Sequence, residues 1–261
     1  MSESGYEPPS ALEPELYGGG QAPAPAPPQS LVDQLLGIFT EPAEVFRRLR
    51  QSPAWVGAFV LLMAVGLAAT LIWAHKVDQE ALTRNNMQVV EDVFHVPHNE
   101  AALQTQIDAI HGQPYLKSAL GVVLVVPLFL LIFSSVLFFF AKVGGEDDQV
   151  SFKHAWAVAS VHNLGTVPIG VLAGLMCLLR PVGGAANYAL LNPANPLFFF
   201  KPENPLLRGL LNLADPFYLF SFVLLFLACK YTLRMKMWAN VLVLSISGLF
   251  GLLFHFIAGI F

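Results

Sequence analysis

Long apolar runs alternate with short polar segments along this chain, and five of the runs are long enough to cross a lipid bilayer. They cover roughly residues 54–74, 116–141, 155–179, 216–233 and 238–261. A transmembrane helix needs about 20 mainly apolar residues. The fourth run is interrupted near its end by Lys230 and Arg234, but it starts with Asp215-Pro216, a favourable N-cap and first-turn pair. The pattern predicts an all-α integral membrane protein, a bundle of five transmembrane helices.

The first 30 residues differ in composition from the remainder of the chain. Residues 1–30 contain seven prolines, four glycines, four glutamates and no lysine or arginine. A secretory signal peptide needs a basic start followed by an apolar stretch, and this segment has neither. It also has too few apolar side chains to offset the entropy lost on folding. We therefore expect a disordered cytoplasmic tail over residues 1–30, followed by a membrane domain over residues 31–261.

Composition supports a membrane protein and argues against several other classes. Hydrophobic residues make up 55% of the chain and charged residues 12%, and the mean hydropathy is +0.59. The net charge of −4 gives no basic field for nucleic acid. Cys177 and Cys229 both lie in apolar runs, so neither a disulfide framework nor a zinc ribbon is indicated. The lipid bilayer is the expected partner, and no nucleic acid is expected.

A short basic segment precedes the first apolar run and predicts the orientation. Arg47, Arg48 and Arg50 lie in residues 42–50, where Val45, Phe46 and Leu49 form an apolar side. This pattern predicts an interfacial helix in the headgroup region, with the arginines as topology signals that contact lipid phosphate. A specific ligand or nucleic-acid contact is the alternative. The positive-inside rule then places the N-terminus in the cytoplasm and the C-terminus on the other side, in the inner or plasma membrane if the protein is bacterial.

Three segments carry a resemblance to a known family. They are Phe39-x-x-Pro42-x-x-x-Phe46 before the first span, SFKHAWAVASVHNLGTVP at 151–168, and DPFYLFSFVLLFLACKYTLRMKMWANVLV at 215–243. In order and pattern they resemble bacterial members of the Yip family, the Yip-one domain group. The resemblance extends over residues 31–261 and implies a five-span helical domain without known catalysis. Eukaryotic members act in vesicle traffic, interact with Rab GTPases and carry an Asp-Leu-Tyr-Gly-Pro-like motif close to the first span. Its nearest likeness here, Glu15-Leu16-Tyr17-Gly18, lacks the proline and lies far upstream, so Rab binding is not carried over.

Residues 75–114 form the largest polar region and contain the weak candidates for a metal site. These are His95, His98 and His111, with Glu91 and Glu100 nearby, and such groups can bind zinc or copper. The spacing matches no strong zinc signature, and Pro97 predicts a turn between two amphipathic helices. Solvated or capping histidines are the favoured interpretation, so we expect no metal and no cofactor.

The polar residues inside the predicted spans have mainly structural interpretations. His162, Asn163 and Thr166 fall within about one turn of the third run, where hydrogen bonds between helices are favoured over a proton path. Gly170 and Gly174 form a small-residue stripe for close helix contact, either within the chain or in a homo-oligomer. Asp215 is expected to cap the fourth span.

These features favour a non-enzymatic multi-pass membrane protein that organises membrane partners or lipids. The alternative is a small permease or a transporter subunit, although the chain shows no evident repeats and a sparse polar interior. A membrane metalloenzyme that uses the histidines of residues 75–114 is the least favoured hypothesis.

Overall fold

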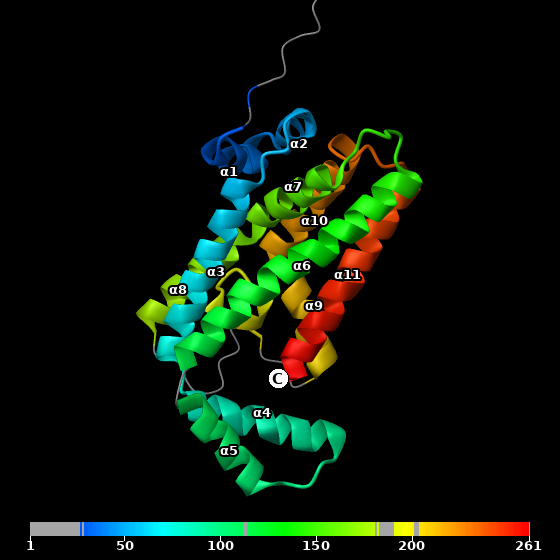
Figure 1. The fold of residues 1–261 in the computed structure, drawn as a ribbon. Coiled ribbons are helices and arrows are strands. Elements are labelled where there is room, and N and C mark those ends of the chain that lie inside the picture. The colour runs from blue at the N-terminus through cyan, green and yellow to red at the C-terminus, as the bar shows by residue number, and fades with distance from the viewer. Residues whose placement is uncertain are drawn as a thin grey trace, which may run out of the picture.

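The chain is helical throughout the part that its computed structural model describes, namely Pro27, residues 29–111, 114–180, Val182, residues 191–200 and 204–260. Within these ranges there is no β-strand, and the one sheet-like pairing is a bridge between Gly145 and Met235. Figure 1 shows a long helical bundle with short helices across one end and a separate helix pair at the other. The all-α class is confirmed.

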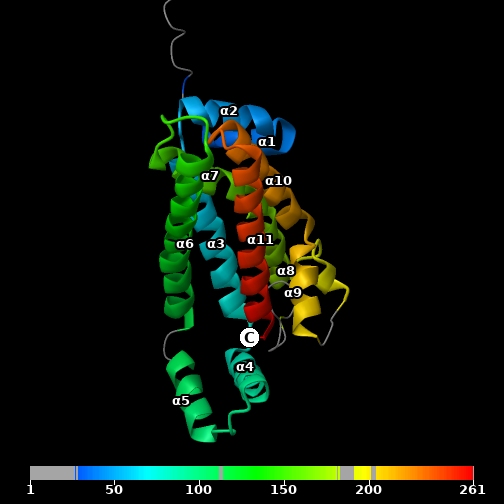
Figure 2. The same ribbon diagram turned by 90° about the vertical axis from the view of Figure 1, so that its right-hand side faces the viewer.

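The bundle is formed mainly by long or strongly apolar helices. They are α3 (Val56–Lys76), α6 (Pro114–Gly144), α7 (Phe152–His162), α8 (Val167–Leu179), α10 (Pro216–Tyr231) and α11 (Met237–Ile260). Figures 1 and 2 show α3, α6 and α11 running along the length of the bundle. Many large apolar side chains on these helices point outward, such as Leu124, Phe129 and Leu249. Outward apolar surface is the arrangement expected for lipid contact, because hydrocarbon solvates these side chains.

Among the residues that the structure describes, three helical segments are long and apolar enough to cross a membrane by themselves. They are Val56–Lys76, Ser118–Gly144 and the continuous helical run Phe152–Leu179. A fourth span exists if α9 (Pro205–Leu213) and α10 are counted together, but they are bent by 61° where they meet. The described apolar part of α11, Met237–Leu253, is shorter than the ~20 residues that a helix needs to cross a bilayer. The predicted count of five spans is therefore not confirmed.

The third apolar run contains a break that the sequence pattern does not predict. Between α7 and α8 lies a short 3-10 helix, η1 (Asn163–Thr166). Pro168 stands in the first turn of α8 and has no N–H to donate to the preceding turn. Gly165 lies so close to α10 that an added Cβ would be 2.8 Å from Cδ1 of Leu224. The break thus coincides with a close approach of two helices.

The predicted polar loop over residues 75–114 contains two helices. They are α4 (Gln79–Phe94) and α5 (Glu100–His111), and they lie beyond the end of the bundle where α11 finishes (Figure 1). Asp78 caps α4 by accepting a hydrogen bond from the Ala81 N–H, 3.0 Å. The α4 helix ends at His95, which adopts a left-handed conformation with φ 54°.

Two short helices cross the opposite end of the bundle. They are α1 (Leu31–Thr40), which the sequence analysis did not predict, and α2 (Pro42–Gln51). Ser30 and Asp33 form a capping box at the start of α1. The apolar side of α2 was expected to face the headgroup region, but Val45, Phe46 and Leu49 are at most 3% exposed. They pack onto the bundle, so protein and not lipid covers this side of the helix.

Candidate functional site at the α2 end of the bundle

The α2 helix is attached to the bundle by polar contacts from three other segments. Asp147 in the α6–α7 loop forms an ion pair with Arg50. Thr232 at the end of α10 donates its hydroxyl to the carbonyl oxygen of Phe46, 2.7 Å. His154 at the start of α7 lies with Nε2 3.0 Å from the carbonyl oxygen of Arg50. The first turn of α7, the α6–α7 loop and the end of α10 therefore all converge on one turn of α2.

Hydrogen bonding assigns the tautomer of His154. Its Nδ1 accepts a hydrogen bond from the backbone N–H of Ser151, 3.1 Å. Since Nδ1 is an acceptor, Nε2 carries the proton and donates it in a hydrogen bond to the carbonyl oxygen of Arg50. Asp147 has its pKa held below the usual range, first by the N–H of Gln149 and then by the Arg50 guanidinium. These contacts form a joint between α2 and the bundle. In this joint Nε2 of His154 is a hydrogen-bond donor and the Asp147 carboxylate is an anion.

A small cavity of about 90 Å³ lies inside this joint and is too small for a metabolite. It is lined by Arg50, Asp147, Gln149, Val150, His154 and Thr232. Nη1 of Arg50 is buried and has no hydrogen-bond partner among the described residues. A water molecule occupies ~30 Å³, so the space suits a few waters that satisfy this nitrogen. The cavity is consistent with a hydrated structural joint.

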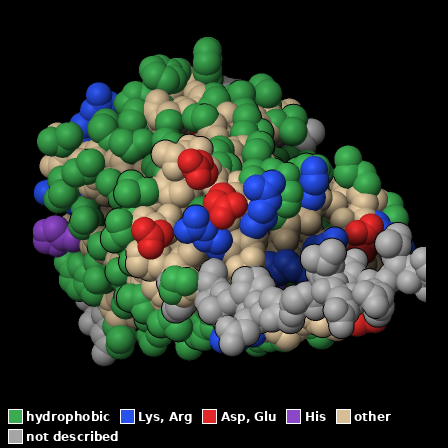
Figure 3. Space-filling model, turned by 90° about the horizontal axis from the view of Figure 1, so that it is seen from above, with side chains coloured by type: hydrophobic (Ala, Val, Ile, Leu, Met, Phe, Trp, Pro, Cys, Tyr) green, Lys and Arg blue, Asp and Glu red, His purple; other side chains and the backbone are tan. Residues whose placement is uncertain are grey.

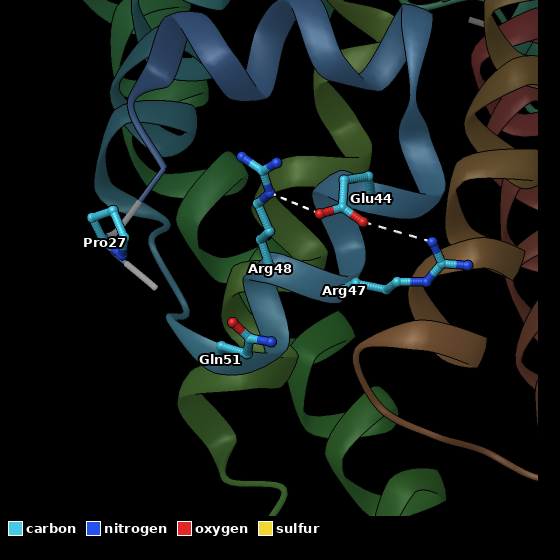
Figure 4. A pocket seen from close by; sticks show the side chains of 5 residues that line it. All are labelled: Pro27, Glu44, Arg47, Arg48 and Gln51. Atoms are coloured by element: carbon cyan, nitrogen blue, oxygen red, sulfur yellow. Dashed lines mark hydrogen bonds and ion pairs between the residues drawn. The ribbon is translucent and has the colours of Figure 1, made fainter. Parts of the chain in front are cut away.

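On the outer side of α2, the carboxylate of Glu44 pairs with two arginines, Arg47 and Arg48. The side chains of Arg47 and Arg48 are 55% and 54% exposed. Glu44 lies 3.6 Å from Nη1 of Arg47 and 2.8 Å from Nε of Arg48. The hydrogen bond from Arg48 holds the pKa of Glu44 below its usual range. Figure 4 shows the two arginines on either side of Glu44, bordering a hollow of about 420 Å³ that Pro27 and Gln51 also line.

The exposed side of α2 that carries Arg47 and Arg48 is called the arginine face here. It continues onto the end of α10. The guanidinium carbon of Arg47 lies 4.6 Å from the centre of the Tyr231 ring, and Nζ of Lys230 lies 5.3 Å from it. Both are cation–π distances. Seen from this end, basic and acidic side chains gather across the described surface, with hydrophobic side chains around them (Figure 3). Charged side chains are therefore concentrated at this end of the bundle, next to the helices whose outward side chains are apolar.

The weak metal candidates at the other end are only partly brought together. His98 Nδ1 lies 2.9 Å from both carboxylate oxygens of Glu91, and its Nε2 lies 3.1 Å from Glu100. These contacts raise the pKa of His98, with Glu91 as the first cause. His95 is exposed at the end of α4, and the side chain of His111 lies outside the described residues. Among the side chains described, no group of three or more His, Cys, Asp or Glu could hold a metal ion.

The polar residues of the third apolar run bond to their own helix. Nδ1 of His162 bonds the carbonyl of Val158, 3.0 Å, and Nδ2 of Asn163 donates to that of Ala159, 2.8 Å. Thr166 donates to the carbonyl of Asn163, 2.8 Å. The sequence favoured bonds between helices at this point, whereas these bonds satisfy the polar groups locally at the break before α8.

The small-residue stripe is used for packing inside the chain at Gly174. A Cβ added to Gly174 would lie 3.8 Å from the Cα of Ala69, so α8 and α3 are in close contact here. Gly170 lies one turn earlier in α8 and is half-buried. The face at Gly174 is thus covered by α3 within the chain.

A buried amide cluster that sequence reasoning missed connects the segment before α9 to the start of α10. Asp215 accepts a hydrogen bond from the N–H of Phe217, 2.8 Å, and another from the side-chain amide of Asn192. Nδ2 of Asn195 donates to Oδ1 of Asn212, 2.7 Å. The side chains of Asp215 and of the three asparagines are at most 7% exposed. The repeated Asn-Pro pairs at 192–193 and 195–196 were the available signal, since such pairs favour turns, but they do not identify the partners of the two amides.

Comparison with known proteins identifies the family. The family model for the Yip1 domain matches residues 36–259, from the middle of α1 almost to the end of α11. No curated protein and no solved structure matches the chain at a significant level. The matched range contains the whole bundle, the α4–α5 pair and the arginine face of α2. The chain belongs to the Yip1 domain family and is a multi-pass membrane protein.

Proposed function

We propose that this protein is a non-enzymatic membrane protein that organises lipids or other membrane proteins at the α2 end of its bundle. The observation that carries the proposal is the composition of this end. It presents exposed arginines from α2 beside exposed apolar residues from α1. Membership in the Yip1 domain family supports the proposal, since the resemblance noted above implies a domain without known catalysis.

The α1 helix carries an exposed apolar stripe along its length. Val32, Leu36 and Phe39 follow the i, i+4, i+7 spacing of one helix face and are 63%, 62% and 47% exposed. Phe39 also stacks on Phe220 of α10, with ring centres 5.3 Å apart. The α1 face is therefore continuous with the outward surface of the bundle. A short helix with an apolar outer face beside cationic residues is typical of the membrane interface.

We further propose that the α2 end faces the cytoplasm. Arg47, Arg48 and Arg50 stand before α3, and the turn between α10 and α11 adds Lys230, Arg234 and Lys236. Basic residues next to spans are retained on the cytoplasmic side. In this orientation the tail is cytoplasmic, and five spans place the C-terminus on the opposite side of the membrane. That membrane is the inner or plasma membrane if the protein is bacterial.

A transporter subunit is the second candidate, and the bend between α9 and α10 favours it. Broken helices and buried acids at membrane depth are features of substrate sites in transporters. Here, however, both carboxylate oxygens of Asp215 already accept hydrogen bonds, from Asn192 and Phe217. This arrangement supports a structural role for Asp215 more than a site for an ion or a substrate.

Affinity purification from native membranes tests the proposed function. The full chain and an Arg47→Gln/Arg48→Gln variant are purified in mild detergent, and co-purifying proteins and lipids are identified. A matched control is Arg84→Gln in α4, where Arg84 likewise pairs with a glutamate four positions earlier, Glu80 at 3.1 Å. We expect the α2 variant to lose companions that the wild type and the α4 variant retain. Identical companions in all three preparations would contradict an organising role for this end.

A further inference from the structure

We infer that Arg47 and Lys230 hold the phosphate of one anionic phospholipid, whose acyl chains lie along the outer face of α10 beside α1. This inference rests on the proposed function and names the class of lipid and the residues that bind it. It is carried by the convergence of two cations on one tyrosine ring and by the apolar stripe that leads to them.

The cationic part of the site is built around Tyr231. Arg47 comes from α2 and Lys230 from α10, and each cation lies within 5.3 Å of the centre of the same ring. Both positive groups therefore lie against the same ring although they come from different helices. Glu44 neutralises Arg47 only partly, because its 2.8 Å contact goes to Arg48 and its contact with Arg47 is 3.6 Å. An anion beside Tyr231 would meet the positive charge that remains.

The apolar part of the site is a stripe on α10 that ends at Lys230. Leu219 and Val223 are 53% and 52% exposed, and Lys230 is exposed as well. At 100° per residue these three positions fall on one face of the helix, within about 40° of each other. Lys230 lies ~10 Å along the axis from Val223. A cation at the end of an outward apolar stripe reproduces the order of headgroup and acyl chain in a phospholipid.

The α1 helix forms the second wall of this stripe. Phe39 stacks on Phe220, the residue next to Leu219, and Leu36 is exposed one turn earlier in α1. An acyl chain lying on Leu219 and Val223 would therefore have the aromatic pair on one side. A headgroup without a cationic amine fits best, because a choline or ethanolamine group would place its positive charge against Arg47 and Lys230. Phosphatidylglycerol is the simplest probe with this chemistry.

Native mass spectrometry of the full chain tests the assignment. The protein is purified in detergent, incubated with phosphatidylglycerol or phosphatidylcholine, and the retained lipid is counted for each variant. We expect phosphatidylglycerol to be retained in preference, and Arg47→Gln/Lys230→Gln to reduce its retention roughly tenfold. The matched control, Lys76→Gln/Arg84→Gln, removes two basic side chains near the α4 end and should leave retention unchanged.

A variant that is expected to increase lipid retention separates loss of binding from misfolding. Glu44→Gln removes the carboxylate that competes for Arg47 and should increase phosphatidylglycerol retention. Equal retention of the two lipids, or equal loss in both double variants, would overturn the assignment. Displacement of the lipid by millimolar inorganic phosphate would also overturn it, because it would indicate a site for a soluble anion. The proposed function would survive such a result if protein companions still depended on Arg47 and Arg48.

Discussion

The hydroxyl of Thr232 donates a hydrogen bond to the carbonyl oxygen of Phe46, 2.7 Å away and 186 positions earlier in the chain. Both residues are fully buried. The contact connects the end of α10 to the middle of α2, and the ion pair between Arg50 and Asp147 lies one turn further along α2. The position of the arginine face thus depends on tertiary contacts from the far end of the sequence.

Replacing Thr232 by valine should loosen α2 with little change in shape. Valine keeps the side-chain volume and removes the donor, so we expect a loss of about 1 kcal/mol in the free energy of unfolding. Thermal unfolding in detergent measures the loss. The control is Thr105→Val, because Thr105 makes a similar bond to the carbonyl of Ala101, 2.8 Å, on the exposed side of α5. An equal effect of both substitutions would show that Thr232 has no special role in holding α2.

Adding a methyl group at Gly165 should destabilise the bundle where η1 meets α10. The new Cβ would be 2.8 Å from Leu224 and 3.4 Å from Phe220, and Leu224 is fully buried. Such overpacking costs about 1–3 kcal/mol. Gly121→Ala is the matched control, since nothing lies within 4 Å of that added methyl group. Alanine there should be neutral or stabilise α6 by up to ~1 kcal/mol. Unchanged melting of Gly165→Ala would mean that α10 is not packed against η1 as described.

The α4–α5 pair should become less stable as the pH rises past neutrality. Its glutamate neighbours raise the pKa of His98 above 6.5, so the folded pair binds the proton more tightly than the unfolded chain does. The resulting stabilisation is present below 6.5 and is lost as the pH rises through the elevated value. Hydrogen exchange of α4 and α5 amides at about pH 5.5 and about pH 8, corrected for intrinsic rates, should show weaker protection at the higher pH. The difference should vanish in His98→Gln, and its persistence would assign it to another group.

Removing the side-chain amide of Asn195 should release the segment before α9. Alanine at this position removes the hydrogen bond from Asn195 to Oδ1 of buried Asn212, which costs about 1 kcal/mol. Limited proteolysis in detergent should then cut the chain near residues 196–200 faster than in the wild type. The control is Asn163→Ala, since the amide of Asn163 bonds to a carbonyl of its own helix. Equal cleavage in the wild type and Asn195→Ala would show that the amide cluster does not hold this segment.

Reporter fusions should give opposite signals at the two ends of the chain. In Figure 1 the α1 helix lies at one end of the bundle and the C-terminus at the other. Fusions of a cytoplasm-specific and an export-specific reporter at Ser30 and after Phe261 measure the topology. We expect a cytoplasmic signal at Ser30 and the opposite signal at Phe261, as five spans require. The same signal at both positions would refute the five-span topology.

The sequence by itself determined the class, the family and three segments that are long enough to cross a membrane. A run of about 20 apolar residues must be buried in lipid or protein along its whole length, so hydropathy alone identifies it. The start of α10 at Asp215-Pro216 was predictable for the same local reason, because an N-cap acts on the first turn of its own helix.

Only the tertiary structure decided which surfaces of these helices are covered. The apolar side of α2 looks interfacial in sequence, yet it is buried because the end of α10 and the start of α7 meet it. The apolar side of α1 stays open because nothing in the described chain packs over Val32 and Leu36. The 3-10 break at Gly165 and the amide cluster at Asp215 likewise depend on neighbours far away in sequence. Periodicity tells which residues share a face, but the partner of that face is set by long-range packing, which no local pattern contains.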